Sequence, residues 1–291
     1  MSDNNFFARL RAKRLSDDRP RGAWKYFIMI SLFSCLVVVP YIYLFSKAFT
    51  DIGGNFTLGN WTFLTQTTVL KNGDKISPAL PGMLYSFLFG ACMATLVVTM
   101  TVPAAYAMSR TEFPGRKLLA RLLIILDAFP GVALLIPYIF LLTFLKLTNK
   151  LSGVMLLCVG TYLPGAVWLM KGFFDNINWD MEWASIVDGA SRFKTFFRII
   201  VPAAKPGIAV ILVNSFLSGW GEYILISIFM RGNATTMSNF IGSMMDSEDG
   251  KYLVSAGMLA AACITYILPV IITFIFTQKT LLQVKQGGSK Q

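Results

Sequence analysis

The chain has 291 residues, of which 55% are hydrophobic and 14% charged, and its formal net charge is +11. Soluble domains are about one-quarter charged, so this composition is typical of a protein largely surrounded by lipid. The chain contains no histidine, which excludes Ser-His triads, HExxH metal sites and histidine relays. We therefore predict no catalytic residue and no metal site, and an integral-membrane enzyme is disfavoured.

Six apolar stretches are long enough to cross a bilayer, for which a helix needs about 20 residues. None has Lys or Arg near its middle. Prolines interrupt several of them, which membrane helices tolerate as kinks. We predict an all-α integral membrane protein with six transmembrane helices. The stretches are residues 26–46, 84–108, 119–145, 154–174, 207–230 and 253–277.

The basic residues alternate along the chain. Segments 1–25, 109–121, 171–206 and 278–291 hold 19 of the 26 Lys and Arg residues. Basic residues concentrate on the cytoplasmic side of membrane proteins. The pattern predicts that both termini are cytoplasmic, and it explains the positive charge without a nucleic-acid partner.

This topology divides the chain into a leader, a membrane domain and a tail. The cytoplasmic leader, residues 1–25, mixes Phe and Leu with Arg and Lys. It suits either a short helix on anionic lipid head groups or a disordered basic tail. The six-helix domain comprises residues 26–277 and contains a cytoplasmic loop at 175–206. The cytoplasmic tail comprises residues 278–291.

Two acidic residues, Asp127 and Glu222, lie within the apolar stretches. A charge at mid-membrane is costly, so both are expected to face protein or water. Trp220 and Tyr223 flank Glu222, and aromatic faces beside a polar group can hold a sugar ring. We predict that these four residues line a translocation path or gate. The alternatives are structural hydrogen bonding between helices and an ion-coupled secondary carrier that uses the two acids.

The chain lacks the GxxxxGK[ST] motif that binds nucleotide phosphates, since its Gly250-Lys251 pair has neither the upstream Gly nor a following Ser or Thr. If ATP drives this protein, another subunit must bind it. Such a subunit needs a rigid cytoplasmic handle, which directs attention to the loop at 175–206.

That loop has the signals of two short helices joined by a tight turn. Asn178 is a typical N-cap for a helix that begins at Trp179. Asp188-Gly189 breaks this helix, and Ser191 can cap the next. An amphipathic connector on the membrane surface is the alternative. Pro202 and Pro206 are expected to end the second helix, whose apolar side is predicted to hold Phe193, Phe196, Phe197 and Ile200.

The loop resembles the signature loop of permease subunits of bacterial ABC importers. The family pattern is Glu-Ala-Ala, three residues, Gly, nine residues, then Ile-x-Leu-Pro. Gly189 occupies the glycine position, and residues 199–202 follow as Ile-Ile-Val-Pro at the family's distance. Other stretches are similar to the sugar-importing branch that includes the maltose importer: residues 56–64, 104–119, 219–230 and 286–291.

The front of the motif departs from the family. Trp183, Ala184 and Ser185 stand where the family has Glu-Ala-Ala, and the nearest acid, Glu182, is one place early. Either Glu182 does the work of the family Glu or the docking contact differs. The resemblance implies that the loop couples the chain to an ATPase through Met181, Glu182, Trp183, Ala184, Ser185, Asp188, Gly189, Ile199 and Pro202.

The resemblance also implies the assembly and its place in the cell. The expected fold is the type I ABC importer permease fold, in the bacterial cytoplasmic (inner) membrane and surrounded by lipid. The expected partners are a homologous second permease subunit, two ATPase subunits and an extracytoplasmic solute-binding protein. This chain is expected to bind no cofactor, because ATP and Mg belong to the partner subunits. The expected cargo is a carbohydrate, for example an oligosaccharide.

Overall fold

The computed structural model describes most of the predicted membrane domain. The predicted leader up to residue 22 and the last four residues of the predicted tail lie outside the described residues. Residues 23 and 279–287 are described by their backbone alone. The described ranges are 23–51, 53–71, 73, 75–230, 236–245 and 254–287.

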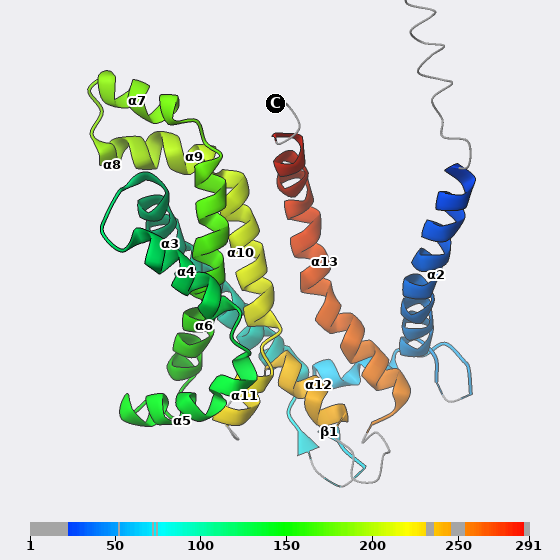
Figure 1. The fold of residues 1–291 in the computed structure, drawn as a ribbon. Helices are drawn as coiled ribbons and strands as arrows, with labels where there is room; N and C mark the ends of the chain where they lie inside the picture. Colours follow the sequence, from blue (N-terminus) through cyan, green and yellow to red (C-terminus); the bar gives the residue numbers. More distant parts are fainter. Residues whose placement is uncertain are drawn as a thin grey trace, which may run out of the picture.

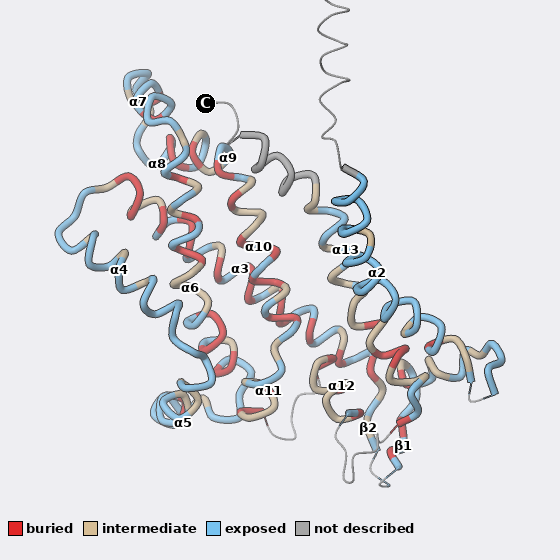
Figure 2. Tube along the Cα trace, turned by 45° about the vertical axis from the view of Figure 1, so that its right-hand side comes forward, coloured by how far each residue is buried: buried red, intermediate tan, exposed pale blue. Residues whose placement is uncertain are grey.

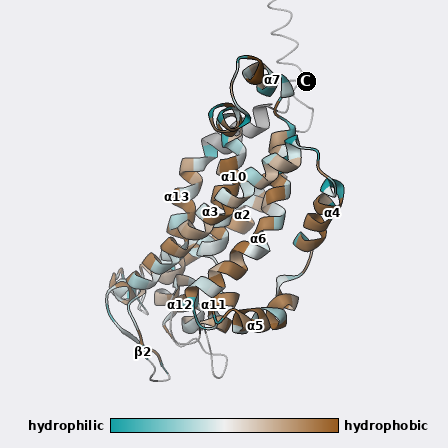
Figure 3. Ribbon diagram, turned by 90° about the vertical axis from the view of Figure 1, so that its left-hand side faces the viewer, coloured by the Kyte–Doolittle hydropathy of each residue, from teal (hydrophilic) through white to brown (hydrophobic). Residues whose placement is uncertain are grey.

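Among the described residues, four helices are long and apolar enough to cross a membrane unbroken, and two bent helix pairs bring the number of candidate spans to as many as six. The ribbon of these helices is coloured brown, for apolar residues, over much of its length in Figure 3. The prediction of an all-α membrane protein is thereby confirmed, and the predicted number of six spans is reached if each bent pair counts as one span. The four unbroken helices are α2 (Ala23–Ala48), α3 (Ala79–Arg110), α6 (Leu151–Asp175) and α13 (Ala256–Gly287).

The third predicted span is bent rather than straight. Helix α4 (Arg116–Asp127) is followed by η2 (Gly131–Leu134) and α5 (Leu135–Phe144), and the two parts meet at 96°. Pro130 lies at the bend. Proline cannot donate a backbone hydrogen bond and disfavours helical geometry in the preceding residue, so it stops α4. Figure 1 shows α5 across one end of the molecule, opposite α7 (Trp179–Val187).

The fifth predicted span, 207–230, is also interrupted. Helix α10 (Lys205–Trp220) ends before Gly221, and α11 (Ile224–Phe229) begins three residues later. The span as predicted is therefore wrong at its C-terminal end. Three short segments lead into α10 at a bend of 73°: α8 (Arg192–Thr195), the π-helical turn η3 (Phe196–Ile200) and α9 (Val201–Ala203).

Helix α3 is the centre of the packing. Helices α6 and α10 both lie along it, and α4 packs on α6. Where α3 and α10 cross, a Cβ added to Gly219 would lie 2.9 Å from the Cα of Gly90. Small residues allow this close approach of helices in membranes. Many of the buried residues, red in Figure 2, lie along α3, α6 and α10.

Helices α2 and α13 form a second arm, with α13 packed against both α2 and α10. None of the apolar window of α2 is buried within the chain, as its pale blue trace in Figure 2 shows. Lipid or another protein must therefore cover this helix. At the end opposite α7, α12 (Met237–Met245) packs on both α13 and α3 and so connects the second arm to the central helix.

The segment between α2 and α3 folds at the same end. It contains η1 (Gly59–Leu64) and a hairpin of β1 (Thr68–Val69) and β2 (Lys75–Ile76). The side-chain amide of Asn60 in η1 donates to the carbonyls of Lys47, Ala48 and Thr50, at 3.4, 3.1 and 3.0 Å. These bonds satisfy carbonyls that the end of α2 would otherwise leave free.

Candidate functional site

A cavity of about 680 Å³ lies between α4, α5, α6, α10 and α11. Both in-span acids line it: Asp127 from the last turn of α4 and Glu222 from the break after α10. Ligand cavities of this size usually combine apolar walls with a few polar groups. Besides apolar residues, the walls include Tyr138, Thr161, Tyr162, Trp168 and Ser218.

Two helices end at this cavity. Helix α4 ends at Asp127 and α10 ends at Trp220, two residues before Glu222. The last carbonyls of a helix lack intrahelical partners, and the helix dipole is negative there. The two carboxylates that line the cavity accept hydrogen bonds, which suits a ligand that donates them.

The positions of the acids are set by close contacts. The Asp127 carboxylate lies directly against Gly165 of α6, where a Cβ would overlap it. The Glu222 Oε1 accepts a hydrogen bond of 2.9 Å from the backbone N–H of Leu225 at the start of α11. Across the cavity, the hydroxyls of Tyr138 and Thr161 are 2.6 Å apart and join α5 to α6.

Trp220 and Tyr223 lie elsewhere, although they flank Glu222 in the sequence. The Trp220 side chain is 2% exposed, stacks on Tyr266 and donates its Nε1–H to the Tyr266 carbonyl at 3.2 Å. Tyr223 lines a separate groove with Ser238 and Tyr266. The helix break at Gly221 turns these neighbours in different directions, so the structure brings only Asp127 and Glu222 together.

The aromatic walls of the cavity come instead from residues that our sequence analysis did not single out. Thr161, Gly165 and Trp168 recur three or four residues apart on α6, and Tyr162 and Leu169 are their immediate neighbours. That spacing places them on one face of a helix. A stripe of polar, small and aromatic residues in an otherwise apolar span was the signal that could have identified them.

The loop at 175–206 folds as predicted at its caps and turn. Helix α7 begins after Asn178, whose Oδ1 accepts the Asp180 N–H at 3.0 Å. Gly189 has a φ of +85°, which favours glycine. The hydroxyl of Ser191 accepts the Lys194 N–H at 3.3 Å and caps α8. The sequence signals for these local features are thus confirmed.

The second helix of the loop differs from the prediction. Phe196 and Ile200 are buried, whereas Phe193 and Phe197 are exposed and pack on one another with ring centroids 4.7 Å apart. The π-helical turn η3 falls in this segment, and a π turn inserts an extra residue that changes the direction of the side chains. The expected single apolar side is therefore divided between interior and surface.

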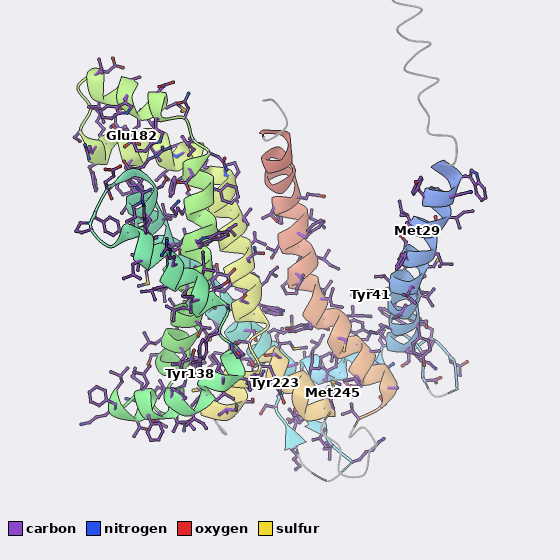
Figure 4. The ribbon with its side chains drawn as sticks, in the orientation of Figure 1. Met29, Tyr41, Tyr138, Glu182, Tyr223 and Met245 are labelled. Atoms are coloured by element: carbon purple, nitrogen blue, oxygen red, sulfur yellow. The ribbon has the colours of Figure 1, made fainter. Side chains whose placement is uncertain are left out.

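Glu182 points into the chain and not outward. The whole Glu182 residue is only 6% exposed. The Oε1 atom accepts a hydrogen bond of 2.6 Å from the Tyr106 hydroxyl of α3, and Oε2 lies 3.5 Å from the Nε of Arg110. Figure 4 shows Glu182 at the end of the molecule opposite Tyr138 and Tyr223.

Arg110, the last residue of α3, ties three elements together at this end. Its Nη2 donates to the carbonyls of Phe174 and Ile177, at 2.9 and 2.6 Å. Its guanidinium carbon lies 4.4 Å from the centroid of the Trp179 ring. Arginine is suited to this position because its planar group can hydrogen-bond and stack at once.

The remaining loop residues fall on two sides. Ser185 and Thr195 are buried, and their hydroxyls are 2.9 Å apart between α7 and α8. Ile199 is half-buried. The exposed members of the predicted docking set are Met181, Trp183, Ala184, Asp188, Gly189 and Pro202.

Comparisons with known proteins identify relatives of this chain. The chain is 27% identical over 280 residues to the trehalose transport system permease protein SugB of Mycobacterium tuberculosis, which covers 92% of this chain and 98% of that protein. It is 33% identical over 205 residues to the galactooligosaccharides transport system permease protein GanQ of Bacillus subtilis, covering 70% of each.

A solved structure shows the same fold. It is the crystal structure of a bacterial ABC transporter involved in the import of the acidic polysaccharide alginate. One chain of that structure superposes on this chain with a TM-score of 0.71 and 19% sequence identity, and the match covers 90% of this chain and 97% of that one. The family model for the inner membrane component of binding-protein-dependent transport systems matches residues 98–280. The chain therefore belongs to this family of inner membrane permeases of ABC importers.

Proposed function

We propose that this chain is one of two homologous permease subunits of an ATP-driven carbohydrate importer. Two separate ATPase subunits bind ATP and Mg and drive the cycle, and an extracytoplasmic binding protein delivers the cargo. Family membership supports the permease role. The names of the relatives, which include trehalose and galactooligosaccharide permeases, support a sugar as cargo.

The observation that supports this function best is the cavity shared by Asp127 and Glu222. Sugar hydroxyls donate hydrogen bonds that the two carboxylates can accept, and the faces of Tyr162 and Trp168 offer apolar surface to a sugar ring. We assign this cavity to the translocation path. Trp220 and Tyr223 are then supports of the helix break and not part of the path.

The loop at 175–206 is the proposed docking site of an ATPase subunit. Its outer side presents exposed apolar residues, among them Trp183, Val187 and Phe193. Isolated exposed apolar side chains are common, but a group of them on one projecting loop is typical of an interaction site. Closure of the ATPases on ATP would move this loop and switch the path between its two sides by alternating access.

The test is transport by the whole complex in proteoliposomes. The permease pair, the ATPase and the binding protein are co-reconstituted, and uptake of trehalose, maltodextrin and galactooligosaccharide is measured with and without internal ATP. We expect ATP-dependent uptake of at least one of these sugars. Uptake that needs an ion gradient and survives without ATP would instead support the ion-coupled carrier, which family membership does not support.

Substitutions in the cavity test the path. Glu222→Gln and Asp127→Asn keep the shape of each side chain and remove its charge. We expect each to lower uptake about tenfold, the effect of weakening one hydrogen bond to a charged group. Glu112→Gln is the matched control, because Glu112 is exposed and outside the cavity. Equal uptake by all three variants would contradict the assignment.

A further inference from the structure

Helix α7 has two faces with different partners. Trp179, Glu182 and Ser185 are three residues apart, so they share one face, and this face packs on the chain itself. Trp183 and Val187, four residues apart, lie on the other face and are 54% and 83% exposed. The acid and the tryptophan are adjacent in the sequence but point to different sides.

The contacts of Glu182 leave it no role on the surface. Its side chain is 8% exposed, and that of Arg110 is 1% exposed. A buried carboxylate must be paired to remain charged, and Glu182 is paired with Tyr106 and Arg110 of its own chain. A partner protein could reach this carboxylate only after the pair had opened.

The same residues connect α7 to two long helices. Tyr106 and Arg110 belong to the end of α3. The Arg110 guanidinium donates to the carbonyl of Phe174 at the end of α6 and to that of Ile177 in the link between α6 and α7. A second polar contact between α3 and α6 lies beside the first. The Ser109 hydroxyl of α3 donates to the Asp175 carboxylate of α6 at 2.6 Å, and Lys171 of α6 donates to the same carboxylate at 2.5 Å. The ends of α3, α6 and α7 therefore form one polar junction.

Both long helices lead from this junction to the cavity. Helix α3 contributes Met93 to the cavity wall, and α6 contributes Thr161, Tyr162, Gly165 and Trp168. A displacement of α7 would thus be passed to the wall along two helices that are continuous from the junction to the cavity. If the junction were loose, α7 could move without moving α3 and α6.

We propose that Glu182 is a positioning residue that locks α7 to α3 and α6, so that the loop and the cavity wall move as one body. The docking contact belongs to Trp183 on the opposite face, and the ATPase surface that receives it is apolar rather than basic. The inference rests on the proposed function, because it assigns separate roles to two neighbouring residues of the docking loop.

The experiment compares Glu182→Gln, Tyr106→Phe and Trp183→Ala in the complete reconstituted complex. Three quantities are measured: the ATPase subunit that co-purifies, the rate of ATP hydrolysis, and sugar uptake per ATP hydrolysed. Tyr106→Phe removes only the hydroxyl that binds Glu182, so it provides a milder variant if Glu182→Gln folds poorly. Glu112→Gln, an exposed acid close to the end of α3, is the control.

We expect the two neighbours to fail in different ways. Glu182→Gln should retain the ATPase and its hydrolysis, while uptake per ATP falls about tenfold, as for loss of one hydrogen bond to a charged group. Tyr106→Phe should act in the same direction, and the double variant should lose less than the sum of the two single losses, because both changes weaken the bond between Tyr106 and Glu182. Trp183→Ala should lower ATPase co-purification and leave uptake per ATP in the remaining complexes unchanged.

Two results would overturn the inference. One is loss of ATPase binding in Glu182→Gln with normal folding, which would make Glu182 a docking contact. The other is unchanged uptake per ATP in both Glu182→Gln and Tyr106→Phe. Failure of the proposed function is distinguishable from both, because the wild-type complex itself would then show no ATP-dependent uptake.

Discussion

Acidic side chains have different surroundings at the two ends of the molecule. In the junction, Glu182 is 6% exposed and pairs with Tyr106 and Arg110. In the cavity, Asp127 is exposed and Glu222 is half-buried. Paired and buried charges determine where helices sit, whereas accessible charges remain available to a ligand. The same residue type is therefore structural at one end and, in our proposal, functional at the other.

This contrast predicts that changes in the junction act on folding and coupling, and that changes in the cavity act on cargo. Four substitutions test it, in order of the effect expected.

The largest effect is expected for Arg110→Met in the junction. The change leaves Glu182 buried without its ion pair and removes two hydrogen bonds to carbonyls. Breaking a buried pair costs about 3–5 kcal/mol. We expect a lower melting temperature and a lower yield of folded protein in detergent. Arg121→Met, at an exposed position on α4, is the control and should change neither the melting temperature nor the yield. Equal melting temperatures of the two variants would contradict a structural role for the junction.

The next effect is expected for Gly189→Val in the loop. Gly189 has a φ of +85°, and forcing a residue with a Cβ into this region costs about 1–2 kcal/mol, more if it is β-branched. We expect reduced ATPase co-purification and uptake with normal membrane insertion. Gly189→Asn is the control, since Asn tolerates this conformation. Wild-type uptake in the Val variant would show that the turn is not needed for coupling.

Gly165→Ala tests the cavity with a single methyl group. A Cβ at this position overlaps the Asp127 carboxylate, which is the end of an exposed side chain, so the substitution displaces the carboxylate and not the helices. We expect uptake to fall while ATPase co-purification stays normal. Gly160→Ala on the same helix is the control, because nothing lies within 4 Å of its added Cβ. Equal uptake in the two variants would argue against Asp127 at the path.

The smallest effect is expected for Asn178→Ala, which removes the cap of α7. Loss of such a cap costs about 1 kcal/mol. We expect a slight drop in melting temperature and no change in sugar preference, because the cap is remote from the cavity. Asn178→Asp keeps an acceptor and should restore the wild-type value. A changed sugar preference in Asn178→Ala would mean that the loop affects cargo recognition in the cavity.

The sequence predicted what depends on composition and local signals. Hydropathy identified the apolar spans, and Asn178, Gly189 and Ser191 identified the caps and turn of the loop. It did not predict the bend of 96° before α5, because proline in a membrane helix is compatible with either a kink or a break. The structure resolves this in favour of a break at Pro130.

The candidate site was predicted only in part. The two acids stand out because charge is rare in an apolar span, and the cavity contains both. Trp220 and Tyr223 were assigned to the path because they are close to Glu222 in the sequence, but neither lines the cavity. Neighbours in sequence share a face only within one helix, and α10 ends between Trp220 and Glu222. The side on which Glu182 lies depends on tertiary contacts with α3, which no local signal contains.

Helix α4 is too short to cross a bilayer. Its 12 residues extend about 18 Å, whereas the hydrocarbon core is about 30 Å thick. The exposed Asp127 at its end would therefore meet acyl chains if lipid bordered the cavity, at a cost of several kcal/mol. In our proposal the second permease subunit fills that place, so that the two chains together complete the permeability barrier of the membrane.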